Sequence, residues 1–136
     1  MRIGLIVAGA QKAGSLGSYA SAVSKGVEAM GHRIDTLDAR TEDGRKLAGY
    51  EYLIVLSEPA SFFSGKIPEY LSKFLASASS LVGKKGAAFL HPAGVFSGKA
   101  MSNLMRAMEK EGMCVNWSET VTKPAIAEAS SKRIGS

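Results

Sequence analysis

The sequence predicts a doubly wound α/β domain, in which helices cover both faces of a five-stranded parallel sheet to form a three-layer αβα sandwich. Apolar runs of strand length alternate along the chain with amphipathic stretches of helical spacing, which is the pattern of such domains. Loops rich in Gly, Ser and Pro follow three of the apolar runs, at the edge where these sheets bind ligands. The length of 136 residues suits a single domain, residues 1–136.

The first half of the chain supplies two strongly apolar strands and one weaker strand. Arg2–Ala8 (RIGLIVA) and Tyr52–Ser57 (YLIVLS) are nearly continuous apolar runs, typical of strands that are covered on both faces. Between them, Arg33–Asp38 alternates poorly and is expected at a sheet edge. A helix is expected before this weaker strand, because apolar residues recur there at helical spacing and Gly31 suits its end. Those apolar residues are Ala20, Val23, Val27 and Met30.

The rest of the chain continues the alternation. Residues 41–49 are a polar connection, and after the second apolar strand a helix is expected from about Ile67, with Pro68 in its first turn. The remaining expected elements are a strand over residues 87–90, a helix over 99–111, a strand over 113–121 and a short helix over 125–133. Five strands favour the smaller of the doubly wound strand orders.

Composition narrows the classes of function. The one cysteine, Cys114, excludes an internal disulfide and a cysteine-ligated metal cluster within the chain, and it is expected to be buried. Two histidines with no carboxylate at ligand spacing predict that there is no metal site. The single cysteine favours a reducing cytoplasm. The apolar runs are too short to cross a bilayer, so no membrane partner is expected.

The net charge of +5 favours an anionic ligand. The Lys and Arg residues are scattered along the chain without a long basic run or a nucleic-acid-binding motif, so no nucleic acid partner is expected. No nucleophile–base pair or carboxylate pair stands out either, and no catalytic side chain is assigned.

The loop after the first strand has the composition of an anion-binding loop. Gly9 and Gly14 match the first half of a Walker A motif, but the lysine that should follow Gly14 is missing, and the glycine spacing also fails the G-x-G-x-x-G pattern. A third reading needs neither motif, because backbone N–H groups and serine hydroxyls at a helix N-terminus can bind one phosphate monoester. The residues expected at the phosphate are Lys12, Ser15, Gly17 and Ser18. The alternative is an ordinary turn in which Ser18 caps the helix.

The stretch "GAQKAGSLG" resembles the loop G-S-x-R-x-x-S-x-N of the NAD(P)H-dependent FMN and quinone reductases, a branch of the flavodoxin-like proteins. Gly9 and Ser15 match, Lys12 stands where arginine is usual, and Ala10 and Gly17 depart from the pattern. Compared with the flavodoxin loop T-x-T-G-x-T, only Gly14 matches. Two later stretches, "GYEYLIVLSEPASFFSGKIPEYLSKFLA" and "LVGKKGAAFLHPAG", are similar to the branch's strands and ring-binding loops in order and spacing.

This resemblance implies a flavodoxin-like fold that binds FMN, with NAD(P)H as co-substrate and a quinone or free flavin as small-molecule electron acceptor. The flavin would supply the chemistry. Because the reductases often dimerise, the resemblance is also compatible with a homodimer. The residues implied around the flavin ring are Pro59, Ser61, Phe62, Phe63, Ala93 and Gly94. The alternative for Phe62 and Phe63 is that they pack into the core. His91 has two possible roles, a hydrogen bond to the flavin or a purely structural hydrogen bond.

Two other functions stay open. One is a flavodoxin-type electron carrier without an NAD(P)H site, although such carriers are typically acidic and this chain is basic. The other is a binding module of the same fold that has lost FMN, suggested by Ala10, Ala13 and Leu16 where the family patterns have hydroxyl groups.

Overall fold

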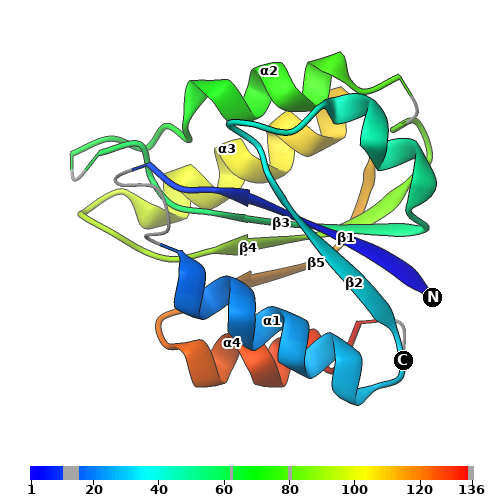
Figure 1. Cartoon of the computed structure of the whole chain (residues 1–136). Coiled ribbons are helices and arrows are strands. Elements are labelled where there is room, and N and C mark those ends of the chain that lie inside the picture. The colour runs from blue at the N-terminus through cyan, green and yellow to red at the C-terminus, as the bar shows by residue number, and fades with distance from the viewer. Residues whose placement is uncertain (11–15, 62, 80, 135–136) are drawn as a thin grey trace.

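The computed structural model describes residues 1–10, 16–61, 63–79 and 81–134. One parallel sheet has the strand order β2-β1-β3-β4-β5. Figure 1 shows the three layers, with α1 and α4 on one face of the sheet and α2 and α3 on the other. The strands are β1 (Arg2–Ala8), β2 (Arg33–Asp38), β3 (Tyr52–Ser57), β4 (Lys85–Leu90) and β5 (Cys114–Thr120). The helices are α1 (Gly17–Ala29), α2 (Glu69–Ser77), α3 (Ser97–Lys110) and α4 (Pro124–Ser131), with a 3₁₀ helix η1 (Gly44–Gly49).

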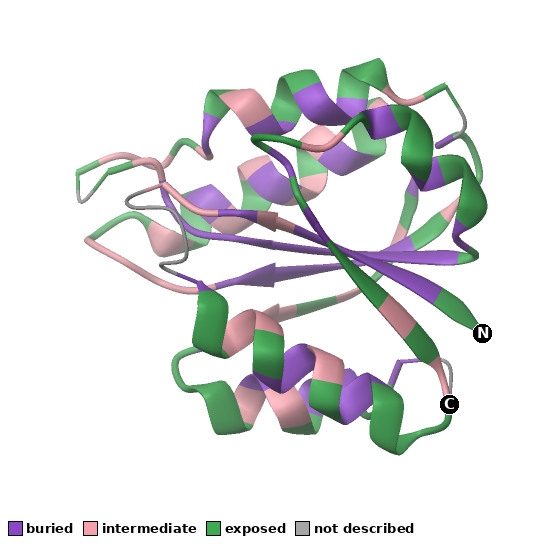
Figure 2. Cartoon of the chain, in the orientation of Figure 1, coloured by how far each residue is buried: buried purple, intermediate pink, exposed green. Residues whose placement is uncertain are grey.

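The central strands carry the two cores. All six residues of β3 are buried, and the neighbouring positions of β1 and β4 are nearly all buried, as the purple strands of Figure 2 show. Alternate residues of β3 face opposite layers, so that Leu53 and Val55 pack under α2 and α3, while Ile54 and Leu56 pack over α1 and α4. The expected doubly wound sandwich, with β2 at an edge, is confirmed.

Several element boundaries differ from the expected ones for local reasons. Pro68 has a ψ of 130° and stands just before α2, so the helix begins at Glu69 rather than at Ile67. Strand β4 begins two residues early, because Lys85 already pairs with Tyr52 of β3. The expectation that Cys114 is buried is wrong, since burial alternates along the edge strand β5 and Cys114 falls on its exposed side.

Close contact between α1 and α4 depends on a glycine. A Cβ placed on Gly26 would lie 1.9 Å from Oγ of Ser131 and 2.4 Å from the carbonyl oxygen of Glu128. The hydroxyl of Ser131 donates to that same carbonyl oxygen at 2.8 Å, which fixes it where it would meet the added carbon. The two helices of this layer therefore pack backbone to backbone at Gly26.

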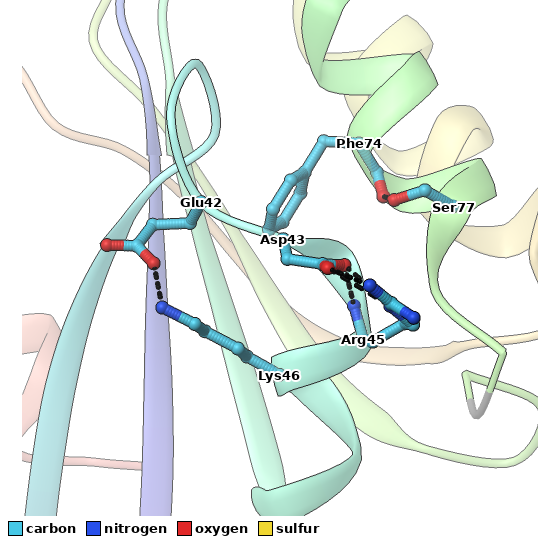
Figure 3. A network of polar contacts seen from close by, with 6 residues as sticks. All are labelled: Glu42, Asp43, Arg45, Lys46, Phe74 and Ser77. Carbon is cyan, nitrogen blue, oxygen red and sulfur yellow. Dashed lines mark hydrogen bonds and ion pairs between the residues drawn. The ribbon is translucent and has the colours of Figure 1, made fainter.

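The connection between β2 and β3 is held by a small polar network (Figure 3). The carboxylate of Asp43 accepts from the backbone N–H of Arg45 at 2.9 Å and from its guanidinium at 2.7 Å, which caps η1. These bonds to Arg45 lower the pKa of Asp43 to about 2. Lys46 pairs with Glu42 one turn away. Next to this network, η1 packs closely against α2, where a Cβ on Gly44 would lie 2.3 Å from Oγ of Ser77.

A lysine joins η1 to the start of β4. Nζ of Lys84 donates to the carbonyl oxygens of Leu47 and Tyr50 at 2.8 and 2.7 Å. Partial burial lowers the pKa of Lys84. Among the described residues, no helix has the length and apolar character required to cross a membrane.

Candidate functional site

Three loops leave the carboxyl ends of the central strands β1, β3 and β4 on the same edge of the sheet (Figure 1, left). Hydrogen bonds between neighbouring strand ends fix this edge. The hydroxyl of Ser57, the last residue of β3, donates to the carbonyl oxygen of Ala8 at 2.8 Å. The N–H of His91, just past β4, donates to the carbonyl oxygen of Ser57 at 2.9 Å. These two bonds join the strand ends from which the three loops start.

The first loop is anchored at Gly9. Its carbonyl oxygen accepts from the hydroxyl of Tyr70 on α2 at 2.5 Å and from Nη2 of Arg40 at 2.7 Å. The guanidinium of Arg40 also lies over the Tyr70 ring, 4.8 Å from its centroid. A side-chain hydrogen bond with Tyr70 is the largest cause that raises the pKa of Arg40. Burial raises the pKa of Tyr70, so its hydroxyl stays a donor at neutral pH. Elements far apart in the sequence thus fix the point where the loop begins.

The N-terminus of α1 lies beyond this loop. Leu16 occupies the N-cap position, and among the described residues no side chain caps the helix. The first turn contains no acidic residue, Gly17 and Ser18 are both exposed, and no described atom would lie within 4 Å of a Cβ on Gly17. Ser18 lies inside the helix, so the alternative in which it caps the helix is wrong. The unpaired amides of a first turn and the helix dipole favour negative charge at such a position.

The loop after β3 is held against α3. The N–H of Ala60 donates to the carbonyl oxygen of Lys66 at 2.7 Å, which closes the loop on itself. Nδ2 of Asn103 on α3 donates to the carbonyl oxygen of Gly65 at 2.6 Å. At the tip, Phe63 is 77% exposed, so packing of this phenylalanine into the core is excluded.

The loop after β4 turns at Gly94, whose φ of 76° is in the left-handed region that favours glycine. His91 precedes the turn, its Nδ1 lies 3.0 Å from the carbonyl oxygen of Val121, and its ring lies 4.4 Å from that of Tyr19 on α1. A carbonyl can only accept, so Nδ1 donates this hydrogen bond. Between the two proposed roles of His91, the structure favours the structural one.

Solved structures with the same architecture identify the fold. The chain matches the two-electron reduced flavodoxin of Megasphaera elsdenii with a TM-score of 0.77 and 17% identity, covering 96% of this chain and 98% of that one. It matches a flavodoxin from the domain Archaea with a TM-score of 0.71 and 22% identity, covering 99% of this chain and 94% of that one. It matches oxidised flavodoxin 1 of Bacillus cereus with a TM-score of 0.72 and 17% identity, covering 96% of this chain and 95% of that one. The fold is flavodoxin-like. No protein-family model matches the chain, and no curated protein sequence does.

The predicted residues that the structure describes lie in or next to the loops at one edge of the sheet, in three separate segments. Gly17 and Ser18 begin α1, and Lys12, Ser15 and Phe62 lie outside the described residues. In the loop after β3, Pro59 is buried and Ser61 is exposed, and in the loop after β4, Ala93 and Gly94 are half-buried. Within the described ranges, no three His, Cys, Asp or Glu side chains come together in a group that could hold a metal ion.

Sequence reasoning missed the residues that brace this edge. A cavity of about 390 Å³ lies beside the first loop, and its described lining contains none of the predicted site residues. It is lined by Ala10, Arg40, Ala60, Pro68, Glu69 and Tyr70. Tyr70 reads in the sequence as part of an apolar helical stripe, and Arg40 as one scattered cation. The available signal was the place of Arg40 two residues after a strand, at the edge where ligands bind.

Proposed function

We propose that this chain binds FMN at the carboxyl edge of its sheet and serves as an electron carrier of the flavodoxin type. The observation that carries the proposal is the N-terminus of α1, whose first turn has no acidic residue and which no side chain in the described part of the chain caps. It lies where the first loop of a flavodoxin-like fold ends, beside the loops after β3 and β4. A phosphate monoester is the anion that such a helix end holds through backbone N–H groups.

The described residues fit the phosphate of FMN. Gly17 leaves room for the group to approach the backbone, because none of the atoms in the described ranges lies within 4 Å of its Cβ position. Ser18 is exposed and offers a hydroxyl donor, and the net charge of +5 adds a general attraction for anions. Lys12 and Ser15 complete the proposed phosphate set.

The ring is proposed to lie between the loops after β3 and β4. Phe63 at one loop tip and Ala93 and Gly94 in the other would shield the ring faces from water, with Pro59, Ser61 and Phe62 completing the contact. The flavin, when bound, supplies the redox chemistry. The protein's part is to hold the phosphate and to orient and shield the ring, which agrees with a site that has no assigned catalytic side chain.

The neighbours named above are flavodoxins, which supports a carrier in preference to an NAD(P)H-dependent reductase. The reductase remains the second candidate, because Gly9 and Ser15 match that branch's loop pattern and Lys12 supplies a cation where arginine is usual. It would take NAD(P)H as co-substrate and pass electrons to a quinone or free flavin. A cytoplasmic location belongs to both versions of the proposal.

Equilibrium titration of the purified protein with FMN and with riboflavin, followed by flavin fluorescence, tests the binding site. Riboflavin lacks the phosphate, so FMN is expected to bind at least about tenfold more tightly if the phosphate is held as proposed. Gly17→Glu places a carboxylate at the α1 N-terminus and should remove most of that difference. Ala29→Glu adds the same charge at the exposed far end of α1 and should leave it unchanged. Equal binding of FMN and riboflavin by the unaltered protein would contradict the phosphate site.

Carrier and reductase are separated by turnover. The FMN-loaded protein is mixed with NADH or NADPH and a quinone, and nicotinamide oxidation is followed by absorbance. A carrier shows no multiple turnover but accepts electrons from a chemical reductant and passes them to a protein acceptor. Multiple turnover with NAD(P)H would establish the reductase instead.

A further inference from the structure

A second cavity, of about 340 Å³, lies at the opposite edge of the sheet, where β3 and β4 begin. Its described lining residues are Met1, Tyr52, Lys85, Asn116, Trp117, Arg133 and Ile134. Tyr52 and Lys85 open β3 and β4, and Arg133 follows α4. In Figure 1 this is the side of the molecule on which both chain ends lie. A strand of six residues spans about 20 Å, so this cavity is well separated from the proposed FMN site.

The cavity is cationic. Lys85 and Arg133 both contribute to its wall, and none of its described lining residues is acidic. The guanidinium of Arg133 lies over the indole of Trp117, 5.5 Å from the ring centroid. A guanidinium fixed in this way beside a concave surface is suited to a planar anion such as a carboxylate.

An indole donor in the same wall has no acceptor. Nε1 of Trp117 is buried and makes no hydrogen bond within the described part of the chain. Indole nitrogen can only donate, and buried donors in folded proteins are almost always paired. Because this nitrogen is buried, we treat the indole as a reporter beside Arg133 and not as a group that contacts the ligand.

The neighbouring polar pair adds a further donor. The hydroxyl of Tyr52 donates to Oδ1 of Asn116 at 2.6 Å, and burial raises the pKa of Tyr52 to about 12, so the phenol keeps its proton. Because Oδ1 accepts this bond, the amide nitrogen of Asn116 is the group that remains to donate. The rings of Tyr52 and Trp117 and the side chain of Ile134 make the rest of the wall apolar.

We propose that this cavity is a second ligand site, which binds a small organic carboxylate with an apolar body. The carboxylate would lie against Arg133 and Lys85 and accept from the amide of Asn116, while the apolar body would contact the ring of Tyr52 and Ile134. A volume of about 340 Å³ is at the small end of ligand pockets, which suits a one-ring acid. This site is independent of FMN and of electron transfer.

The sequence contains one tryptophan, so its indole N–H gives a single, unambiguous signal in a ¹H–¹⁵N correlation spectrum. Benzoate is titrated into the full chain at constant ionic strength, with benzamide, its neutral counterpart, as the control ligand. The expected result is a saturable shift of the indole resonance with benzoate and none with benzamide. No saturable shift, or the same shift with benzamide, would overturn the proposal.

Charge-removing variants test which cations are responsible. Arg133→Gln and Lys85→Gln should each weaken benzoate binding, by about tenfold for Arg133, because a charge-assisted bond is lost. Arg106→Gln removes the same charge from the groove between α2 and α3 and should leave the affinity unchanged. The remaining cross-peaks of each spectrum report whether the variant is folded. Benzoate affinity in both cavity variants equal to that of the unaltered protein would overturn the proposed site. A loss in Arg106→Gln equal to that in the cavity variants would show that the attraction comes from net charge alone.

Discussion

The hydroxyl of Tyr70 donates to the carbonyl oxygen of Gly9 across 2.5 Å, which connects α2 directly to the first residue after β1. The loop that begins at Gly9 leads to the N-terminus of α1, where we place the phosphate. A bond between residues 61 positions apart therefore sets where the proposed cofactor loop starts.

Tyr70→Phe is expected to weaken FMN binding by several-fold and to lower the free energy of unfolding by about 1 kcal/mol, since one buried bond is lost. Isothermal titration and urea unfolding measure the two effects. Tyr50→Phe is the matched control, because its hydroxyl bonds to Asp35 at 3.0 Å away from the loop. It should affect stability but not FMN affinity, and a loss of affinity in the control equal to that in Tyr70→Phe would contradict the role of the anchor.

Gly26→Ala is expected to destabilise the protein by about 1–3 kcal/mol, because the added methyl group overlaps Ser131 and Glu128 where α1 meets α4. Gly98→Ala makes the same change in the first turn of α3, where nothing lies within 4 Å, and should raise stability by up to about 1 kcal/mol. Thermal and urea unfolding compare the two variants. Similar stability changes in both would show that the close approach of α1 and α4 is not a constraint.

Lys84→Met is expected to lower the free energy of unfolding by about 1–3 kcal/mol, because the carbonyl oxygens of Leu47 and Tyr50 both lose their bond to Nζ. Lys85→Met is the control at the next residue, where the side chain is exposed, and it should change stability by less than about 0.5 kcal/mol. Urea unfolding at neutral pH measures both. A larger effect at Lys85 than at Lys84 would contradict this assignment.

Asp43 makes stability depend on pH. The bonds to Arg45 lower its pKa from 3.8 to about 2 in the folded state, so the folded protein holds this proton less tightly than the unfolded chain. Its stabilising contribution is therefore present above about pH 4 and is lost as the pH falls towards 2. Asp43→Asn keeps an acceptor for the backbone of Arg45 but removes the charge, so it should be less stable than the unaltered protein at pH 7. In urea unfolding the difference should close between pH 4 and pH 2, and a difference that widens over that range would contradict the assignment.

Much of the fold follows from local sequence. The bounds of β1, β2 and β3 could be predicted because these strands are marked by apolar runs or by turn residues on each side. The start of β4 could not, because Lys85 and Gly86 join the strand by pairing with Tyr52 and Leu53, a contact that no local pattern records. Cys114 was placed wrongly for a related reason: an apolar neighbour such as Val115 does not reveal which side of an edge strand faces the core.

The candidate site also combines features that the sequence predicts with features that depend on long-range packing. Topology places the loops after β1, β3 and β4 on one edge, so the position of Gly17, Ser18 and Gly94 at that edge could be predicted from sequence alone, while their contact with a ligand stays a prediction. The braces of that edge could not, because Tyr70 and Arg40 meet Gly9 only through the packing of α2 and the end of β2. Trp117 is a similar case, since its missing acceptor is a property of the folded wall.

The first measurement is the flavin content and flavin affinity of the purified protein, by visible absorbance and by titration with FMN. The proposed site predicts an oxidised-flavin spectrum that survives removal of excess FMN, and a much weaker complex with riboflavin. A colourless protein that binds neither flavin would contradict the carrier and the reductase alike, and would identify the chain as a flavodoxin-fold binding module without FMN.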